Sequence, residues 1–216
     1  MSNHLERFEK QLLIEFIMQA DGPIVIRSSE PTLLNPILPN TTFLQGQKDE
    51  EHNTTYVIPG SSIKGVFRHY MEPTEGSYDD LFGGIRKKGR ISFYDAYADL
   101  DTVKWRTKHT TEINSYTQGA REGTLNSVQM IERGDFQEVI RITNPLWKEI
   151  MSLKRAISAM NEGMIRIGGK QSTGFGCMKI RNITYTLTTY TEELQEQILY
   201  KGMHLEELQK AFHKRR

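Results

Sequence analysis

The sequence predicts an α+β fold in which strands outnumber helices and the two kinds of element do not alternate regularly. Several runs are rich in β-branched and aromatic residues, only residues 145–163 show a long helical periodicity, and two long polar segments interrupt the regular elements. The sequence contains no internal repeat and no low-complexity linker. A chain of 216 residues is long enough to bury one substantial core or two small ones.

The first third of the chain predicts two strands, a long loop and a short helix. Residues 11–18 and 24–26 are rich in branched apolar residues and are separated by the turn-forming sequence ADGP, so we expect a β-hairpin. Residues 28–55 lack periodicity and hold three prolines, which predicts a loop that is either disordered or functional. The sequence IKGVFRHYME, residues 63–72, predicts a short helix ended by Pro73.

The sequence GRISFYDAYAD predicts a strand that begins near Arg90, and the remaining elements follow it. Residues 103–135 are polar and weakly periodic, which predicts a second long excursion from the core. Residues 135–143 alternate as a strand does, and residues 145–163 predict the best helix, with proline at its start and glycine after its end. A strand over residues 177–188 follows a glycine-rich turn. This strand-rich order argues against a parallel βαβ core, and so against a nucleotide-binding protein of that class.

The composition excludes several classes of protein. The 28 Lys and Arg residues against 27 Asp and Glu residues leave a formal charge of +1, so any polyanion must be bound by a local patch. A single cysteine, Cys177, excludes an internal disulfide and a cysteine-based zinc cluster, which fits a reducing cytoplasm. Residues 1–10 lack the apolar core of a signal peptide, and no run approaches the roughly 20 apolar residues that span a bilayer. We therefore expect a cytoplasmic protein with no membrane partner.

The stretch IPGSSIKGVFRHYME, residues 58–72, predicts an anion-binding helix start. Backbone N–H groups and the hydroxyls of Ser61 and Ser62 can point toward a phosphate, where the helix dipole favours negative charge. Lys64 adds a point charge and Arg68 a planar fork. The spacing is not that of a nucleotide P-loop. The alternative is that a serine simply caps the helix and Lys64 is solvated.

A second segment, IRIGGKQSTGFGCMKI over residues 165–180, places four glycines and a lysine before the strand at 177–188. Glycine permits positive φ and close backbone approach, and the neighbouring polar side chains supply hydrogen-bond donors. The alternative is an ordinary glycine-rich turn between a helix and a strand. The candidate ligand-binding residues in this loop are Gly168, Gly169, Lys170, Ser172 and Thr173.

Taken together and in this order, these segments resemble a known family. IPGSSIKGVFR (58–68), LFGG (81–84), GRISFYDAY (89–97) and GGKQSTGFGCMKI (168–180) are similar to the repeat-associated mysterious protein (RAMP) superfamily of CRISPR effector proteins. The long loop before IPGSS and the polar segment ending in MIERGDF are most similar to the backbone subunit of type III CRISPR interference complexes. The resemblance extends over residues 12–188.

This resemblance implies a ferredoxin-like, RNA-recognition-motif-like core with a β-hairpin thumb and long loop insertions. Residues 1–190 would form the RNA-binding domain, with a thumb insertion at about 103–136 whose hairpin comes from residues 112–136. Residues 191–216 would form a C-terminal amphipathic helical tail, which either covers its own domain or docks a neighbouring subunit. The apolar residues of the tail at near-helical spacing are Leu194, Ile198, Leu205, Leu208 and Phe212.

The resemblance also implies partners. The phosphate would belong to CRISPR RNA, held by the helix start and the glycine loop through contacts that do not depend on base sequence. Copies of the chain would stack along this guide with other type III effector subunits and would hold target RNA. Arg121, Met130 and Arg133 in the thumb would contact the guide–target duplex, with a solvated loop and a buried methionine as the alternative.

One departure from the family bears on catalysis. The family cuts target RNA with an aspartate in the loop before IPGSS, and the matching segment here has Asn40 at that position and Gln45 where an arginine is frequent. Asparagine carries no charge and binds divalent cations poorly, so we expect RNA binding without cleavage and no metal site. Mg²⁺ or Mn²⁺ would be needed only by a cleavage-competent form. A naturally inactive relative and a deliberate replacement of aspartate both fit. The acids at 49–51 could supply the carboxylate from a shifted register, with a solvated acidic run as the alternative.

Two further members of the same family are alternatives. A single-copy subunit at the end of the complex shares the IPGSS motif. A guide-processing endoribonuclease would depend on a catalytic histidine near its N-terminus, and His4 precedes the first predicted strand. The six histidines show no metal-binding spacing.

Overall fold

The computed structural model describes residues 9–27, 43–47, 54–75, 78–85, 87–111, 113, 116–121, 126–190 and 195–214. The strands are β1 (Lys10–Ala20), β2 (Gln45–Gln47), β3 (Thr54–Ile58), β4 (Ile91–Phe93), β5 (Ala96–Ala98), β6 (Lys104–Thr110), β7 (Asn126–Arg133), β8 (Asp135–Thr143), β9 (Met178–Tyr190) and β10 (Glu196–Gly202). The helices are α1 (Gly60–Glu75), α2 (Asp79–Phe82), α3 (Trp147–Asn161) and α4 (Leu205–His213), with short 3₁₀ turns at Leu100–Thr102 and Gln171–Thr173.

An antiparallel sheet forms the body of the molecule. Its order is β10-β9-β1-β8-β5-β3-β2, and β4 also pairs with β8 beside β5. β1 is central, because it pairs with β8 along one edge and with β9 along the other. The strands predicted over residues 135–143 and 177–188 are confirmed as β8 and β9, and the helix predicted over 145–163 is confirmed as α3. The chain is therefore a mixed α and β structure, as predicted.

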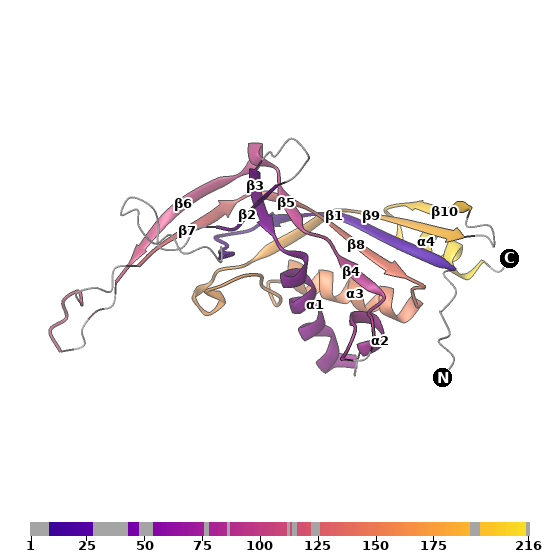
Figure 1. The fold of residues 1–216 in the computed structure, drawn as a ribbon, viewed down its shortest axis with the longest axis horizontal. Coiled ribbons are helices and arrows are strands. Elements are labelled where there is room, and N and C mark those ends of the chain that lie inside the picture. The colour runs from indigo at the N-terminus through magenta and orange to yellow at the C-terminus, as the bar shows by residue number, and fades with distance from the viewer. Residues whose placement is uncertain are drawn as a thin grey trace.

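The core lies between the sheet and the helices. Along β1, Leu12, Ile14, Phe16 and Met18 are buried, whereas Glu15 between them is exposed. Figure 1 shows α1, α2 and α3 on the same side of the sheet, which is the side that these buried residues face. Alternation along the strand therefore assigns one sheet face to the core.

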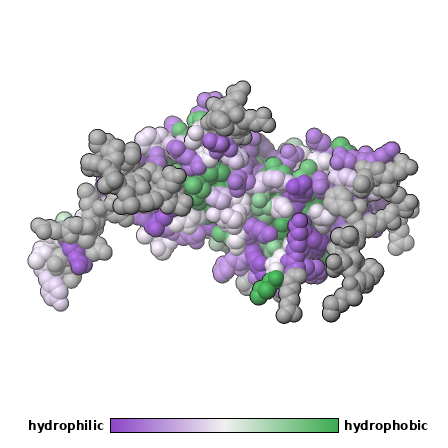
Figure 2. Space-filling view, viewed as in Figure 1, coloured by the Kyte–Doolittle hydropathy of each residue, from purple (hydrophilic) through white to green (hydrophobic). Residues whose placement is uncertain are grey.

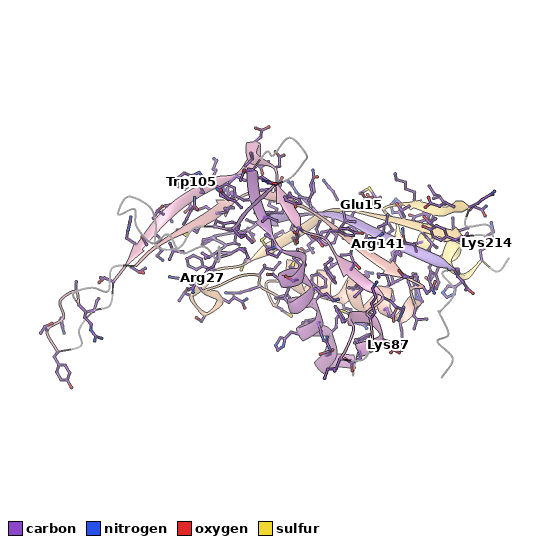
Figure 3. The ribbon with its side chains drawn as sticks, viewed as in Figure 1. Glu15, Arg27, Lys87, Trp105, Arg141 and Lys214 are labelled. Carbon is purple, nitrogen blue, oxygen red and sulfur yellow. The ribbon has the colours of Figure 1, made fainter. Side chains whose placement is uncertain are left out.

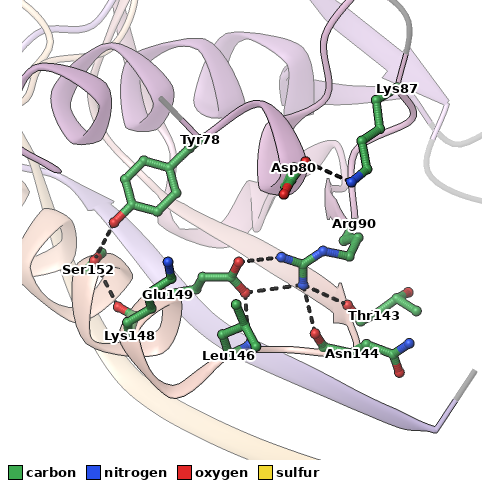
Figure 4. Close-up of polar contacts among 10 residues, drawn as sticks. All are labelled: Tyr78, Asp80, Lys87, Arg90, Thr143, Asn144, Leu146, Lys148, Glu149 and Ser152. Atoms are coloured by element: carbon green, nitrogen blue, oxygen red, sulfur yellow. Dashed lines mark hydrogen bonds and ion pairs between the residues drawn. The ribbon is translucent and has the colours of Figure 1, made fainter. Parts of the chain in front are cut away.

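The buried ion pair between Arg90 and Glu149 holds α3 against the sheet (Figure 4). The guanidinium of Arg90 donates to both carboxylate oxygens of Glu149 and to the backbone oxygen of Asn144, the latter at 2.7 Å. Glu149 also accepts from the N–H of Leu146 at 2.9 Å, which satisfies a donor at the helix start. This network joins the end of β8 to the first turn of α3.

The predicted hairpin between residues 11–18 and 24–26 is wrong. Both edges of β1 are occupied by β8 and β9, so the segment after the ADGP turn has no edge to pair with. Instead Ile24 forms an antiparallel bridge with Ile131 of β7, and Arg27 forms one with Phe43. The segment 24–27 therefore connects the body to the β6–β7 hairpin.

Two predicted boundaries also differ. α1 continues through Pro73 to Glu75, so the proline does not end the helix where the sequence predicted. The single strand predicted near Arg90 is divided into β4 and β5, with Tyr94 and Asp95 between them. This interruption matters for the candidate site, because Asp95 lies in it.

A two-stranded hairpin, β6–β7, projects from the body (Figure 1). The predicted hairpin is present, but its first strand is β6, which begins before residue 112. β6 is exposed along most of its length, so it lacks the alternation that marks a half-buried strand.

The C-terminal residues differ from the predicted helical tail. Glu196–Gly202 forms the edge strand β10, paired with β9, and only Leu205–His213 is helical among the described residues of this tail. Leu208 of α4 is buried, and Phe212 contacts Trp147 of α3 with ring centroids 5.5 Å apart. α4 therefore covers its own domain. No helix in the described part of the chain is long and apolar enough to cross a membrane.

Candidate nucleic-acid interface

The start of α1 is clamped onto the turn between β4 and β5. The N–H of Gly60 donates to Oδ1 of Asp95 at 2.8 Å. A Cβ at Gly60 would lie 2.3 Å from the backbone oxygen of Phe93 and 2.6 Å from that of Tyr94. The glycine is thus required by close packing, and the first N–H of the predicted anion cradle is already bound to a carboxylate.

The other residues of the helix start remain near the surface. Ser61 is exposed and Ser62 is half-buried, with its N–H bonded to the backbone oxygen of Pro59 at 2.9 Å. Lys64 is half-buried and donates to the backbone oxygen of Ile91 at 3.4 Å. Burial, and secondarily the charge of Arg68, lower the pKa of Lys64. Two hydroxyls and one ammonium therefore remain beside the clamped turn.

The guanidinium of Arg68 contacts acceptors within the chain. It donates to Glu72 at 2.7 Å, to Asp79 at 2.9 Å and to the backbone oxygen of Gly83 at 2.8 Å. Three of its five N–H donors are thus used inside the chain. Arg68 ties α1 to α2, and its planar fork faces these acceptors.

The glycine loop packs against the segment 24–27. Gly168 has φ +87°, and a Cβ there would lie 2.3 Å from the backbone oxygen of Val25. The N–H of Gly169 donates to the same oxygen at 2.9 Å. Gly168 is therefore needed both for its backbone conformation and for this close approach.

The polar residues of the loop point away from this packing. Lys170 adopts a left-handed backbone with φ 59° and ψ 29°, and Thr173 Oγ1 donates to its backbone oxygen at 2.9 Å. Ser172 and Thr173 are exposed, and Lys170 is half-buried. Within the described residues, the ammonium of Lys170 has no hydrogen bond or ion pair, so it is available to an anion.

A short ladder of backbone hydrogen bonds connects the glycine loop to the end of β3, which leads into the start of α1. Val25 accepts from Gly169, Ile26 accepts from the N–H of Leu44 at 2.9 Å, and Leu44 accepts from the N–H of Val57 at 3.1 Å. Hydrogen-bonded neighbouring strands lie about 4.8 Å apart. The three hydrogen bonds of this ladder therefore place the glycine loop about 14 Å from the end of β3. The two predicted segments thus lie along one ribbon of backbone rather than in one pocket.

The hairpin residues have different environments. Met130 is 1% exposed and packs with Val25, Val128 and Phe175, so its predicted place at an RNA-contacting surface is wrong. It faces the glycine loop and anchors the hairpin to it. Arg133 is exposed, and Arg121 is exposed with an interaction elsewhere in the chain.

Comparison with known proteins agrees with the sequence motifs. A family model described as the RAMP superfamily matches residues 18–179. The chain belongs to the RAMP superfamily. A solved structure described as the type III-B Cmr-beta complex bound to cognate target RNA contains a similar chain, with a TM-score of 0.60 and 20% sequence identity. The alignment covers 82% of this chain and 61% of that one, so this RAMP chain matches about three fifths of its neighbour. No curated protein matches.

Several predicted residues of this RAMP chain lie outside the described residues. Asn40, which stands at the family's aspartate position, is among them, as are the acids at 49–51. Gln45 is exposed on β2 and hydrogen-bonds to Tyr56. The described part of the chain contains no cluster of three or more His, Cys, Asp or Glu side chains that could hold a metal.

Sequence reasoning missed the cations of β6. Lys104, Arg106 and Lys108 are exposed on this strand, and the ammonium of Lys108 lies 5.4 Å from the ring centroid of Phe175 in the glycine loop. Their alternation in KWRTKHT was the available clue. Arg27 is a further exposed cation, two residues after Val25 (Figure 3).

A buried acid near the start of α1 was also missed. Glu138 is 1% exposed, and neither carboxylate oxygen has a hydrogen-bond partner within the described residues. Phe16 lies opposite it on β1, and the preceding residue, Gln137, lies opposite Tyr97 on β5. Burial, reinforced by the charge of Asp95, raises the pKa of Glu138 to about 9. The carboxyl is therefore neutral at pH 7.

Proposed function

We propose that this chain is an RNA-binding subunit of a type III CRISPR effector complex, in which it holds the backbone of CRISPR RNA and supports target RNA. The observation that carries the proposal is the available ammonium of Lys170 on an outward-facing polar loop, within a chain of net charge +1. A local cationic ribbon in a nearly neutral chain indicates a specific polyanion track rather than nonspecific binding.

The proposed core is ferredoxin-like and resembles an RNA-recognition motif. In chain order the central elements are β1, α1, β4 with β5, β8, α3 and β9, and the strands are ordered β9-β1-β8-β4/β5 in space. This order supports a βαββαβ unit, to which β2, β3 and β10 add edge strands. The β6–β7 hairpin would be its thumb.

The proposed RNA track follows the ladder between the glycine loop and α1. Its ends are Lys170 with Ser172 and Thr173, and Ser61 with Lys64, and Arg27 lies between them. Backbone, hydroxyl and lysine contacts with phosphates carry no base specificity, which suits a guide of any sequence.

We further propose that copies of this chain and other effector subunits assemble on the guide in the cytoplasm. The neighbour's description names a complex bound to cognate target RNA, which supports target RNA as the second nucleic acid here. Among the described residues, β2 and β10 are the terminal strands of the sheet, and their outer edges would make such contacts.

RNA binding is tested by titrating the full chain with single-stranded RNA over a range of salt concentrations. Lys170→Ala should weaken binding to all sequences alike and reduce the salt slope by about 0.7 for one lost phosphate contact. Lys201→Ala, which removes an exposed cation from β10 at the other end of the sheet, is the matched control and should leave the slope unchanged. Equal behaviour of both variants would contradict the proposed track.

We propose that the chain binds RNA without cutting it, because Asn40 replaces the family's aspartate. The test compares the chain with Asn40→Asp in the assembled complex, with Mg²⁺ or Mn²⁺ and with guide and target binding followed in parallel. Regular cleavage only by Asn40→Asp would assign the active site to residue 40. Cleavage by the unaltered chain at the same positions would refute the binding-only role.

A further inference from the structure

The side chain of Gln171 spans the glycine loop. Its amide nitrogen, Nε2, donates to the backbone oxygen of Arg166 at 3.2 Å and to that of Gly168 at 2.9 Å. Gln171 is exposed, so water could satisfy the same amide donors while the side chain kept its rotamer freedom. Both acceptors belong to the loop itself. The two hydrogen bonds therefore fix the conformation of the loop rather than that of the domain.

Arg166 makes this connection reciprocal. Its Nη1 atom donates to the backbone oxygen of Gln171 at 2.9 Å, and its Nε atom donates to the backbone oxygen of Gly163 at 3.4 Å. The N–H of Gly174 donates to the same oxygen of Gln171 at 3.1 Å. Residues 166 and 171 thus exchange hydrogen bonds between side chain and backbone, and this exchange closes the loop.

The closed loop has a backbone conformation that most residues avoid. Gly168 has φ +87° and Gly174 has φ +89°. Between them, Lys170 has φ 59° and ψ 29°, in the left-handed region where glycine and asparagine are more usual. Glycine would adopt this backbone without strain, but it would not supply an ammonium. A strained lysine whose ammonium has no partner within the described residues indicates a function for that charge.

The loop is also anchored on both sides of this lysine. The N–H of Gly169 donates to the backbone oxygen of Val25, and the N–H of Gly176 donates to that of Pro23, each at 2.9 Å. Residues 170–174 lie between these anchors, so the exchange between residues 166 and 171 governs their conformation. Figure 2 shows hydrophilic residues spread along the side of the molecule that it draws, with hydrophobic surface only in small areas between them. These features favour a charged ligand that a pre-formed loop binds through polar contacts.

We propose that Gln171 is a positioning residue, whose amide holds the loop in the conformation that presents the ammonium of Lys170 to an RNA phosphate. This inference rests on the proposed RNA-binding function and deepens it, because it assigns part of the affinity to the order of the loop before RNA binds. Gln171 acts through Lys170 and makes no RNA contact of its own. A loop that is already ordered loses less conformational entropy on binding than a mobile loop with the same charge.

The test is a double-mutant cycle on the full chain, with binding of labelled oligouridine of about 12 nucleotides followed by anisotropy. Gln171→Ala removes no charge, so it should keep the salt slope while weakening binding by about 3- to 12-fold, the cost of ordering one long side chain. In the Lys170→Ala background, Gln171→Ala should change the affinity by less than about 1.5-fold, because no ammonium is left to position.

The matched control is Gln197→Ala, which removes another exposed glutamine, from β10, and should leave the affinity unchanged in both backgrounds. Urea unfolding of each variant is measured in parallel, and Gln171→Ala should have nearly the midpoint of the unaltered chain, because its acceptors lie within one exposed loop. An equal loss of affinity from Gln171→Ala in both backgrounds, or no loss in either, would overturn the positioning role and leave the proposed function standing. Absence of RNA binding by the unaltered chain would overturn both.

Discussion

Replacement of Glu138 by glutamine should change how the stability of this protein depends on pH. The carboxyl is 1% exposed, has no hydrogen-bond partner in the described structure, and has a pKa of about 9 against 4.5 for an unperturbed glutamate. Folding therefore keeps a proton that the unfolded chain releases above pH 4.5. The contribution of Glu138 to the free energy of unfolding is therefore highest below pH 4.5 and falls as the pH rises toward 9.

The magnitude follows from the pKa difference. Each pH unit between these two values lowers the contribution of Glu138 to the free energy of unfolding by about 1.4 kcal/mol. This contribution therefore falls by about 3 kcal/mol between pH 4.5 and pH 7. This is a large part of the roughly 5–15 kcal/mol that stabilises a domain. Glutamine does not titrate, so Glu138→Gln should be more stable than the unaltered chain by about 3 kcal/mol at pH 7 and nearly equal to it near pH 4.5.

The assay is urea unfolding of Glu138→Gln and of the unaltered chain at several pH values from 5.5 to 7.5. At each pH, the free energy of unfolding of the unaltered chain is subtracted from that of Glu138→Gln. That difference should grow by about 3 kcal/mol over these two units, since shared titrations cancel. For the control Glu15→Gln, on the exposed face of β1, the difference should stay within about 0.5 kcal/mol. A flat difference for Glu138→Gln would refute the assignment of a neutral buried carboxyl.

Two further predictions concern the packing around the site and are measured by urea unfolding at pH 7. Gly60→Ala should lose more than about 2 kcal/mol, because its Cβ would overlap backbone oxygens, whereas Gly65→Ala in the same helix has open space and should gain about 0.5–1 kcal/mol. Equal effects would contradict the clamped helix start. Glu149→Ala should cost about 3–5 kcal/mol, because the guanidinium of Arg90, 14% exposed, would lose its carboxylate partner, whereas Lys87→Ala removes an exposed pair and should cost less than about 1 kcal/mol. A loss of less than about 1 kcal/mol for Glu149→Ala would show that the network does not hold α3.

The elements that the sequence predicted best are those whose own residues carry the pattern. α3 has helical spacing with proline and glycine at its ends, and β8 alternates between buried and exposed positions. β6 escaped prediction because it is exposed along most of its length, so buried and exposed positions do not alternate along it, although its cations do. The tail was mistaken for one helix because the apolar residues of β10 and α4 together imitate helical spacing.

The sequence by itself determined which functional groups are present. These are a helix start with glycine and serines, a glycine loop with a lysine, and asparagine at position 40. Only the tertiary structure decided which of these groups remain free. Asp95 reaches Gly60 across 35 residues, and Met130 is buried by Val25 and Phe175 from distant parts of the chain. Such partners are chosen by the pairing of strands far apart in sequence, and no local pattern of residues encodes them.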